Sequence, residues 1–146
     1  MPPHLDIYVA TFDRSTDCIN RFLSAYADLS QDSLRSDYEI QLTDVNTWVE
    51  TGSLLTTIDY GLADANRSFA LYFSSNSLFI KSVMLYFSSK SRLLLGLSIE
   101  GNQSNGLPDT NAAERILKTL KDEFNSDKGL IDFELPPADA DEQIDF

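Results

Sequence analysis

The chain has 146 residues and a hydrophobic content of 42%, which fits one globular domain with a sizeable core and excludes global disorder. Its 23 acidic and 11 basic residues give a net charge of −12, which repels nucleic acid and anionic lipid and favours a basic partner, although acidity can also serve solubility alone. The single cysteine excludes an internal disulfide, and the N-terminal residues lack the features of a signal peptide, so we expect a cytoplasmic protein with no membrane partner.

The charge is unevenly distributed along the chain. Residues 1–64 have a net charge of −8, residues 65–108 of +3, and residues 109–146 of −7. The middle segment is also rich in apolar residues. We therefore expect the middle of the chain to form the centre of a sheet and the two flanks to supply an acidic surface.

The first predicted elements are a strand and a helix. Residues 5–12 alternate and are rich in β-forming residues, which predicts a strand. A helix over 14–28 follows, with Asp13 or Ser15 as its N-cap. Its apolar residues recur at helical spacing and define one buried face: Ile19, Phe22, Leu23 and Tyr26.

A second strand and a short helix come next. Residues 37–43 alternate between apolar and polar side chains, which indicates a half-exposed strand. The polar segment 44–52 contains the only tryptophan of the chain. The apolar spacing that begins at residue 54 then predicts a short helix, with Ser53 or Thr51 as its cap.

The middle of the chain contains a near-repeat, LYFSSNS at 71–77 and LYFSSKS at 85–91. Each copy reads as the end of a strand followed by a turn, because polar residues interrupt both apolar runs. Strands over 68–73, 78–87 and 92–101 then form an antiparallel meander. The first of these is apolar on both faces, which indicates a central strand.

The last predicted elements are a helix over 111–126, ended by Lys128-Gly129, and a strand over 130–135. Pro136-Pro137 ends the strand, and the acidic residues after it predict a mobile tail over 137–146. The element order predicts an α+β fold. We expect one domain over 1–136, an α/β sandwich whose mainly antiparallel sheet has the meander at its centre and carries the two main helices.

Catalytic chemistry is difficult to assemble from these residues. His4 is the only histidine and lies near the N-terminus, so any Ser/His/Asp or Cys/His arrangement would have to use His4 as its base. Cys18 lies early in a predicted helix, where the helix dipole can lower a thiol pKa, but free cysteines are more often buried. With one His and one Cys, and no calcium-loop or phosphate-loop spacing, we expect no metal, no cofactor and no catalytic residue.

Trp48 is the best candidate for a binding residue. It lies between Asp44 and Glu50 in a polar segment, and Asp59 and Tyr60 follow. Exposed aromatic residues are enriched at binding hot spots, and acidic neighbours complement Arg or Lys of a partner. The alternative is that Trp48 covers the edge of the core, because tryptophan is usually buried. A second, weaker set of candidates lies in the acidic tail: Asp139, Asp141 and Glu142.

Several stretches resemble the small acidic immunity-type proteins of bacterial polymorphic and contact-dependent toxin systems. These are LDIYVATFDRS with INRFLSAYAD, GLADANRSFALYF, LLLGLSIEG, AERILKTLKDEF and GLIDFELPP. Most of these residues belong to core patterns, so the resemblance carries no binding residues across. It implies a cytoplasmic protein that binds and blocks a cognate toxin.

The sequence therefore predicts a non-enzymatic inhibitor of a basic effector, of which a nuclease-type toxin is the leading example. The alternative is an acidic interaction or scaffolding domain, homodimeric through an exposed sheet edge, with no toxin partner. An enzyme would require a pocket with convergent carboxylates of shifted pKa.

Overall fold

The computed structural model describes residues 4–43, 45–100 and 110–144 of the chain. Their elements, in chain order, are β1 (Leu5–Thr11), α1 (Thr16–Tyr26), β2 (Ala27–Asp28), a 3-10 turn η1 (Asp32–Leu34), β3 (Tyr38–Leu42), β4 (Thr47–Gly52), α2 (Leu54–Ala63), β5 (Phe69–Ser75), β6 (Ile80–Ser88), β7 (Arg92–Ile99), α3 (Thr110–Glu123), β8 (Lys128–Phe133) and α4 (Pro137–Gln143). The predicted α+β class is confirmed.

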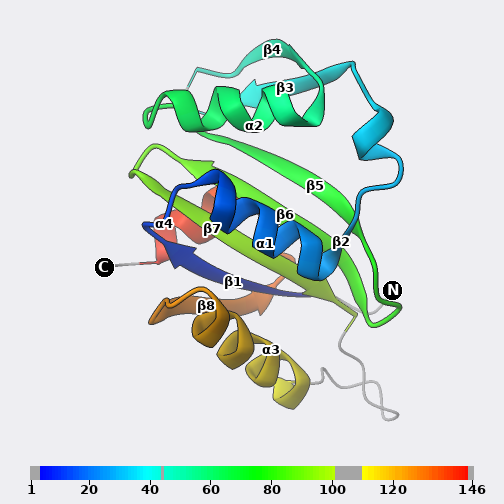
Figure 1. Cartoon of the computed structure of the whole chain (residues 1–146). Coiled ribbons are helices and arrows are strands. Elements are labelled where there is room, and N and C mark those ends of the chain that lie inside the picture. The colour runs from blue at the N-terminus through cyan, green and yellow to red at the C-terminus, as the bar shows by residue number, and fades with distance from the viewer. Residues whose placement is uncertain (1–3, 44, 101–109, 145–146) are drawn as a thin grey trace.

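The main sheet has the strand order β2-β5-β6-β7-β1-β8, and all its pairings are antiparallel (Figure 1). Strands β5, β6 and β7 form the predicted meander. The repeated LYFSS stretches end β5 and β6, as expected from two successive turns. Strand β5 is not central, however, because only the two-residue strand β2 lies beyond it. The centre is formed by β6, β7 and β1.

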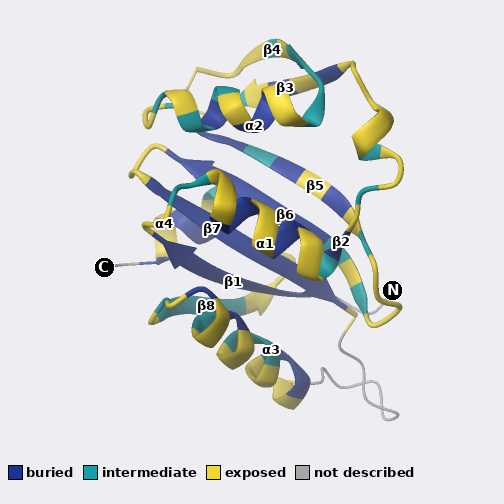
Figure 2. Ribbon diagram, in the orientation of Figure 1, coloured by how far each residue is buried: buried dark blue, intermediate teal, exposed yellow. Residues whose placement is uncertain are grey.

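One face of the sheet holds the larger core. Alternate residues of β1, such as Ile7 and Val9, point to this side and are fully buried. Helices α1 and α3 cover it with the apolar stripes that the sequence predicted, and Phe22 of α1 meets Phe124 edge-on at 5.7 Å between ring centroids. Figure 2 shows the central strands as buried and the outward sides of both helices as exposed.

The opposite face carries a smaller core and is covered by α4. Tyr8 and Ala10, the intervening residues of β1, pack there with Leu135, Ala140 and Ile144. The prediction of a mobile tail is therefore wrong for residues 137–144. Pro137 starts the helix, as proline can at a first helical position, and Ala140 and Ile144 supply an apolar stripe too short to be recognised in the sequence.

The starts of two helices follow the predicted capping. Ser15 accepts a hydrogen bond from the backbone N–H of Cys18, and Ser53 accepts one from that of Thr56. The predicted stop of α3 at Lys128-Gly129 is wrong, since both residues belong to β8. The helix ends instead at Glu123, and Asn125 adopts the left-handed conformation at φ 50°.

Strand β4 was also missed, because its segment is polar and carries no regular apolar alternation. It pairs with β3 in a separate two-stranded hairpin, hereafter the β3–β4 hairpin, which lies beside β5 at one end of the main sheet (Figure 1). Among residues 4–43, 45–100 and 110–144, no helix is long and apolar enough to cross a membrane.

Candidate functional site

The β3–β4 hairpin has one buried and one exposed face. Tyr38 and Ile40 of β3 point inward and are almost fully buried in the larger core. The alternate residues point outward, and the cross-strand register sets them in opposed pairs: Glu39 opposite Glu50, and Gln41 opposite Trp48. We call Glu39, Gln41, Trp48 and Glu50 the hairpin outer face.

A β-bulge determines which residues meet on this face. The register shifts between Tyr38 and Glu39, so that Thr51 has no opposite residue and Gly52 adopts a φ of 93°. The Thr51 hydroxyl lies 2.6 Å from that of Thr57 on α2, which holds the bulge against the helix. The shift places Glu50 directly opposite Glu39.

An open groove of about 380 Å³ lies between the β3–β4 hairpin, the α4 side of the main sheet, and the start of α4. Trp48 and Tyr72 line it with large rings that are 60% and 59% exposed, and the buried Tyr86 lines it as well. Two consecutive prolines, Pro136 and Pro137, also line it. The groove therefore offers apolar and aromatic surface that the described residues leave open.

The electrostatic character of this region is acidic. Glu39 lines the groove, and the described lining residues include no Lys or Arg. Like charges directly opposite each other on two strands are destabilising, so the Glu39–Glu50 pair favours a cation between or above the two carboxylates. Burial raises the pKa of Tyr72, with Asp6 adding a smaller effect, so the Tyr72 phenol is neutral at pH 7.

The structure brings together only part of the predicted patch. Trp48 and Glu50 share the hairpin outer face, and Asp44 lies outside the described residues. Asp59 and Tyr60 lie on α2, which packs on the other face of the sheet. The Tyr60 ring contacts Phe69 of the larger core and is covered by the Arg67 guanidinium, 3.8 Å from the ring centroid.

The C-terminal acids have three different environments. Asp139 is exposed in the first turn of α4, and Glu142 is exposed with its carboxylate 3.8 Å from the Lys90 ammonium. Asp141 is only 3% exposed and faces the sheet. A carboxylate in this position is not available to a partner at the surface, so the prediction of Asp141 as a binding residue is wrong.

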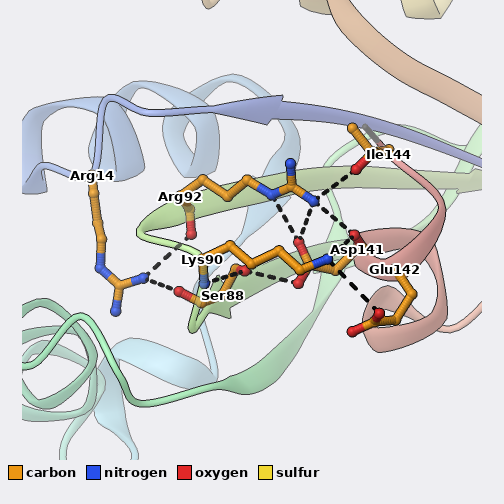
Figure 3. Close-up of polar contacts among 7 residues, drawn as sticks. All are labelled: Arg14, Ser88, Lys90, Arg92, Asp141, Glu142 and Ile144. Atoms are coloured by element: carbon orange, nitrogen blue, oxygen red, sulfur yellow. Dashed lines mark hydrogen bonds and ion pairs between the residues drawn. The ribbon is translucent and has the colours of Figure 1, made fainter. Parts of the chain in front are cut away.

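The buried contacts of Asp141 explain this orientation (Figure 3). Its Oδ1 accepts a hydrogen bond from Nε of Arg92 at 2.9 Å, and its Oδ2 accepts one from the Ser88 hydroxyl at 2.8 Å. The same guanidinium donates to the backbone carbonyls of Asp141 and Ile144, at 2.7 and 3.1 Å. This buried ion pair fastens α4 to β7, and both charges are compensated.

Arg14 lies on the other side of the β6–β7 turn (Figure 3). It donates to the carbonyls of Ser88 and Gly61, at 2.8 and 2.6 Å, and so ties this turn to the end of α2. Burial lowers the Arg14 pKa, and nearby Asp64 partly opposes this shift. Its role is structural, because its side chain joins backbone segments rather than lining the groove.

The residues considered for catalysis lie apart from the groove. Cys18 is 1% exposed, and burial is the main cause that raises the pKa of its thiol to about 11, so the thiolate is scarce at neutral pH. Within the described ranges, no group of three or more His, Cys, Asp or Glu is arranged to hold a metal ion.

Two residues of this region were missed in the sequence. Glu39 was read only as the polar side of a strand, and Tyr72 as part of the repeat. The alternation of residues 37–43 does place Glu39 outward, but its pairing with Glu50 depends on the bulge.

Comparison of the chain with protein-family models, curated proteins and solved structures gives no match.

Proposed function

We propose that this protein is a non-enzymatic inhibitor that binds a basic protein partner through the hairpin outer face and the adjoining groove. The observation that supports this most is the Glu39–Glu50 pair beside the exposed ring of Trp48. A Lys or Arg side chain of the partner would relieve the repulsion between the carboxylates. It would also lie within reach of an aromatic face that attracts cations.

The proposed partner is a toxin whose active-site cleft is positively charged, of the nuclease type. A protein with a net charge of −12 approaches such a cleft rapidly, because its field steers the encounter. An acidic surface with an exposed tryptophan at its centre then occludes the cleft without any chemistry of its own. The immunity-type resemblance of the sequence agrees with this proposal.

The test is inhibition by matched variants. The tagged protein is used to capture partners from its native lysate, and the activity of a captured basic protein is assayed with added wild-type protein or variants. We expect inhibition at a one-to-one ratio by the wild type and by the control Asp59→Lys/Glu142→Lys. We expect none by Glu39→Lys/Glu50→Lys, which changes the net charge equally.

Comparing the two double variants separates the effect of where the charges lie from the effect of the net charge. Glu39→Lys/Glu50→Lys keeps a like-charge pair across the hairpin, so the fold experiences the same kind of repulsion before and after the change. Equal inhibition by both double variants would show that the hairpin is not the binding surface. The absence of any basic partner whose activity is blocked would overturn the proposed function.

A further inference from the structure

Strand β8 ends the main sheet, and among the described residues no strand pairs with its outer edge (Figure 1). An unpaired edge presents backbone N–H and C=O groups to any strand of matching register. We propose that a second copy of this chain occupies this edge, with β8 pairing antiparallel to β8 of the other copy. This proposal does not depend on the function of the groove.

The alternation of hydrogen bonds shows which backbone groups point outward. The Glu134 N–H donates to the His4 carbonyl at 3.0 Å, one position beyond the β1–β8 register. Opposed residues alternate between pairs that exchange hydrogen bonds and pairs that do not, so Lys128, Leu130 and Asp132 bond toward β1. The backbone groups of Gly129 and Ile131 therefore point away from the sheet.

Because only the odd-numbered residues of β8 direct their backbone groups outward, two copies can exchange hydrogen bonds only in registers that place odd-numbered residues opposite one another. In the register centred on Leu130, Gly129 of one copy exchanges hydrogen bonds with Ile131 of the other. Leu130 then faces its own symmetry mate, and Lys128 faces Asp132. Both are non-hydrogen-bonded pairs, in which side chains approach most closely.

Charge selects this register. Lys128 and Asp132 share one face of β8 with Leu130 between them, so two Lys128–Asp132 pairs flank a Leu130–Leu130 contact. A register centred on Ile131 would place Leu130 against Asp132. It would also require Glu134 to continue the strand, although Glu134 has a φ of 43°. Self-pairing of β8 in the Leu130 register is isologous and closes as a dimer.

One local contact limits the length of the pairing. The Phe133 N–H, which points outward, donates to Oδ1 of Asp132 at 2.8 Å. This removes one donor from the edge and leaves Gly129 and Ile131 as the residues that bond the second copy. The second carboxylate oxygen of Asp132 stays available for Lys128 of the other copy. The interface is therefore small, and we expect a reversible dimer.

The test uses charge exchange and sedimentation velocity over a range of protein concentrations. We expect the wild type to form a reversible dimer, and Lys128→Glu and Asp132→Lys each to raise the dimer dissociation constant at least about tenfold, because both symmetry-related pairs become repulsive. Mixing these two variants should restore dimerisation, since every pair is then Glu–Lys or Asp–Lys. The double variant should also dimerise.

The mixing experiment excludes an unrelated effect of either substitution. The control Lys90→Glu/Glu142→Lys exchanges a surface ion pair elsewhere and should dimerise as the wild type does. If Asp132→Lys unfolds, as judged by circular dichroism, the milder Lys128→Gln and Asp132→Asn should weaken the dimer by smaller factors. A wild type that stays monomeric at every concentration, or single variants that dimerise unchanged, would overturn the proposal.

Discussion

The β3–β4 hairpin and helix α4 both come from acidic stretches of the sequence, but they place their carboxylates in opposite environments. The hairpin exposes Glu39 opposite Glu50, with no cation to compensate either charge among the contacts described for them. Helix α4 turns Asp141 inward, where Arg92 and Ser88 satisfy it. The number of acidic residues in a segment therefore does not define a binding surface. The nearest cation decides whether a carboxylate holds the fold together or is left for a partner.

The largest expected effect is on the buried acid. Asp141→Ala should lower the free energy of unfolding by about 3–5 kcal/mol, because it leaves the Arg92 guanidinium buried without a counter-charge. Its neighbour Glu142 forms only an exposed ion pair with Lys90, so Glu142→Ala should change stability by at most about 1 kcal/mol. Urea unfolding measures both. Similar values for the two variants would remove the distinction between the buried and the exposed acid.

A second change tests the exposed aromatic residue. Trp48→Ala should weaken binding of the captured partner by at least about 30-fold. This factor corresponds to a loss of about 2 kcal/mol, which is typical when a hot-spot tryptophan is truncated. It should change stability little, since the side chain is 60% exposed. Leu55→Ala is the matched control, because Leu55 is a 62% exposed apolar residue on α2. Titration calorimetry in which both variants bind equally well would exclude Trp48 as a contact.

A third test concerns a buried acid that lacks an arginine. Burial raises the pKa of Asp6, although its carboxylate accepts a hydrogen bond from the Leu135 N–H at 2.7 Å. At pH values between the ordinary pKa of aspartate, about 3.9, and the raised pKa of Asp6, the folded state binds more protons than the unfolded state. We call this pH range the window. Stability contributed by Asp6 is full below this window and is lost as the pH rises through it.

Asp6→Asn removes this dependence and keeps an acceptor for the Leu135 N–H. The difference in the free energy of unfolding between Asp6→Asn and the wild type should therefore shift in favour of the variant as the pH rises through the window, and level off above it. Thermal unfolding over a pH series measures this. A difference that is constant with pH would contradict a raised pKa.

The smallest expected effect is on the hairpin itself. Glu50→Gln removes the cross-strand repulsion with Glu39, so it should raise the free energy of unfolding by about 0.2–1 kcal/mol, more at low salt than at high salt. Asp59→Asn, at an exposed position of α2, should change stability less. If Glu50→Gln destabilises the protein at both salt concentrations, the two carboxylates do not repel each other as the register implies.

Much of the fold could be predicted from local patterns. The β-forming residues over 5–12 and the helical spacing after Ser15 identified β1 and α1, because each stretch carries the period of a single type of element. The burial of β1 on both faces, by contrast, comes from the packing of α4 on the second face. Helix α4 was missed because it has only one turn of apolar contacts, and its charges suggested a tail. Asp141 is indistinguishable from Asp139 in the sequence, since only the fold brings Arg92 beside it.

The candidate site was predicted less completely, because it too depends on contacts between residues that are far apart in the sequence. Trp48 and Glu50 could be singled out as candidates because an aromatic residue among acids is a local signal, and the structure leaves both exposed. Tyr60 was misplaced because its cover, Arg67, comes from the loop after α2. Glu39 was missed because the bulge at Thr51 sets its partner, and a one-residue register shift leaves no signature in composition.

The most direct measurement uses Trp48, the only tryptophan, as a fluorescent reporter of its own surface. A hexa-arginine peptide is titrated into the wild type, Glu50→Lys and Asp59→Lys, two variants with the same net charge. We expect a salt-sensitive change in fluorescence, with a dissociation constant several-fold higher for Glu50→Lys than for Asp59→Lys. Equal dissociation constants for the two variants would show that binding of the peptide depends only on the net charge of the protein. That result would contradict a binding surface on the β3–β4 hairpin.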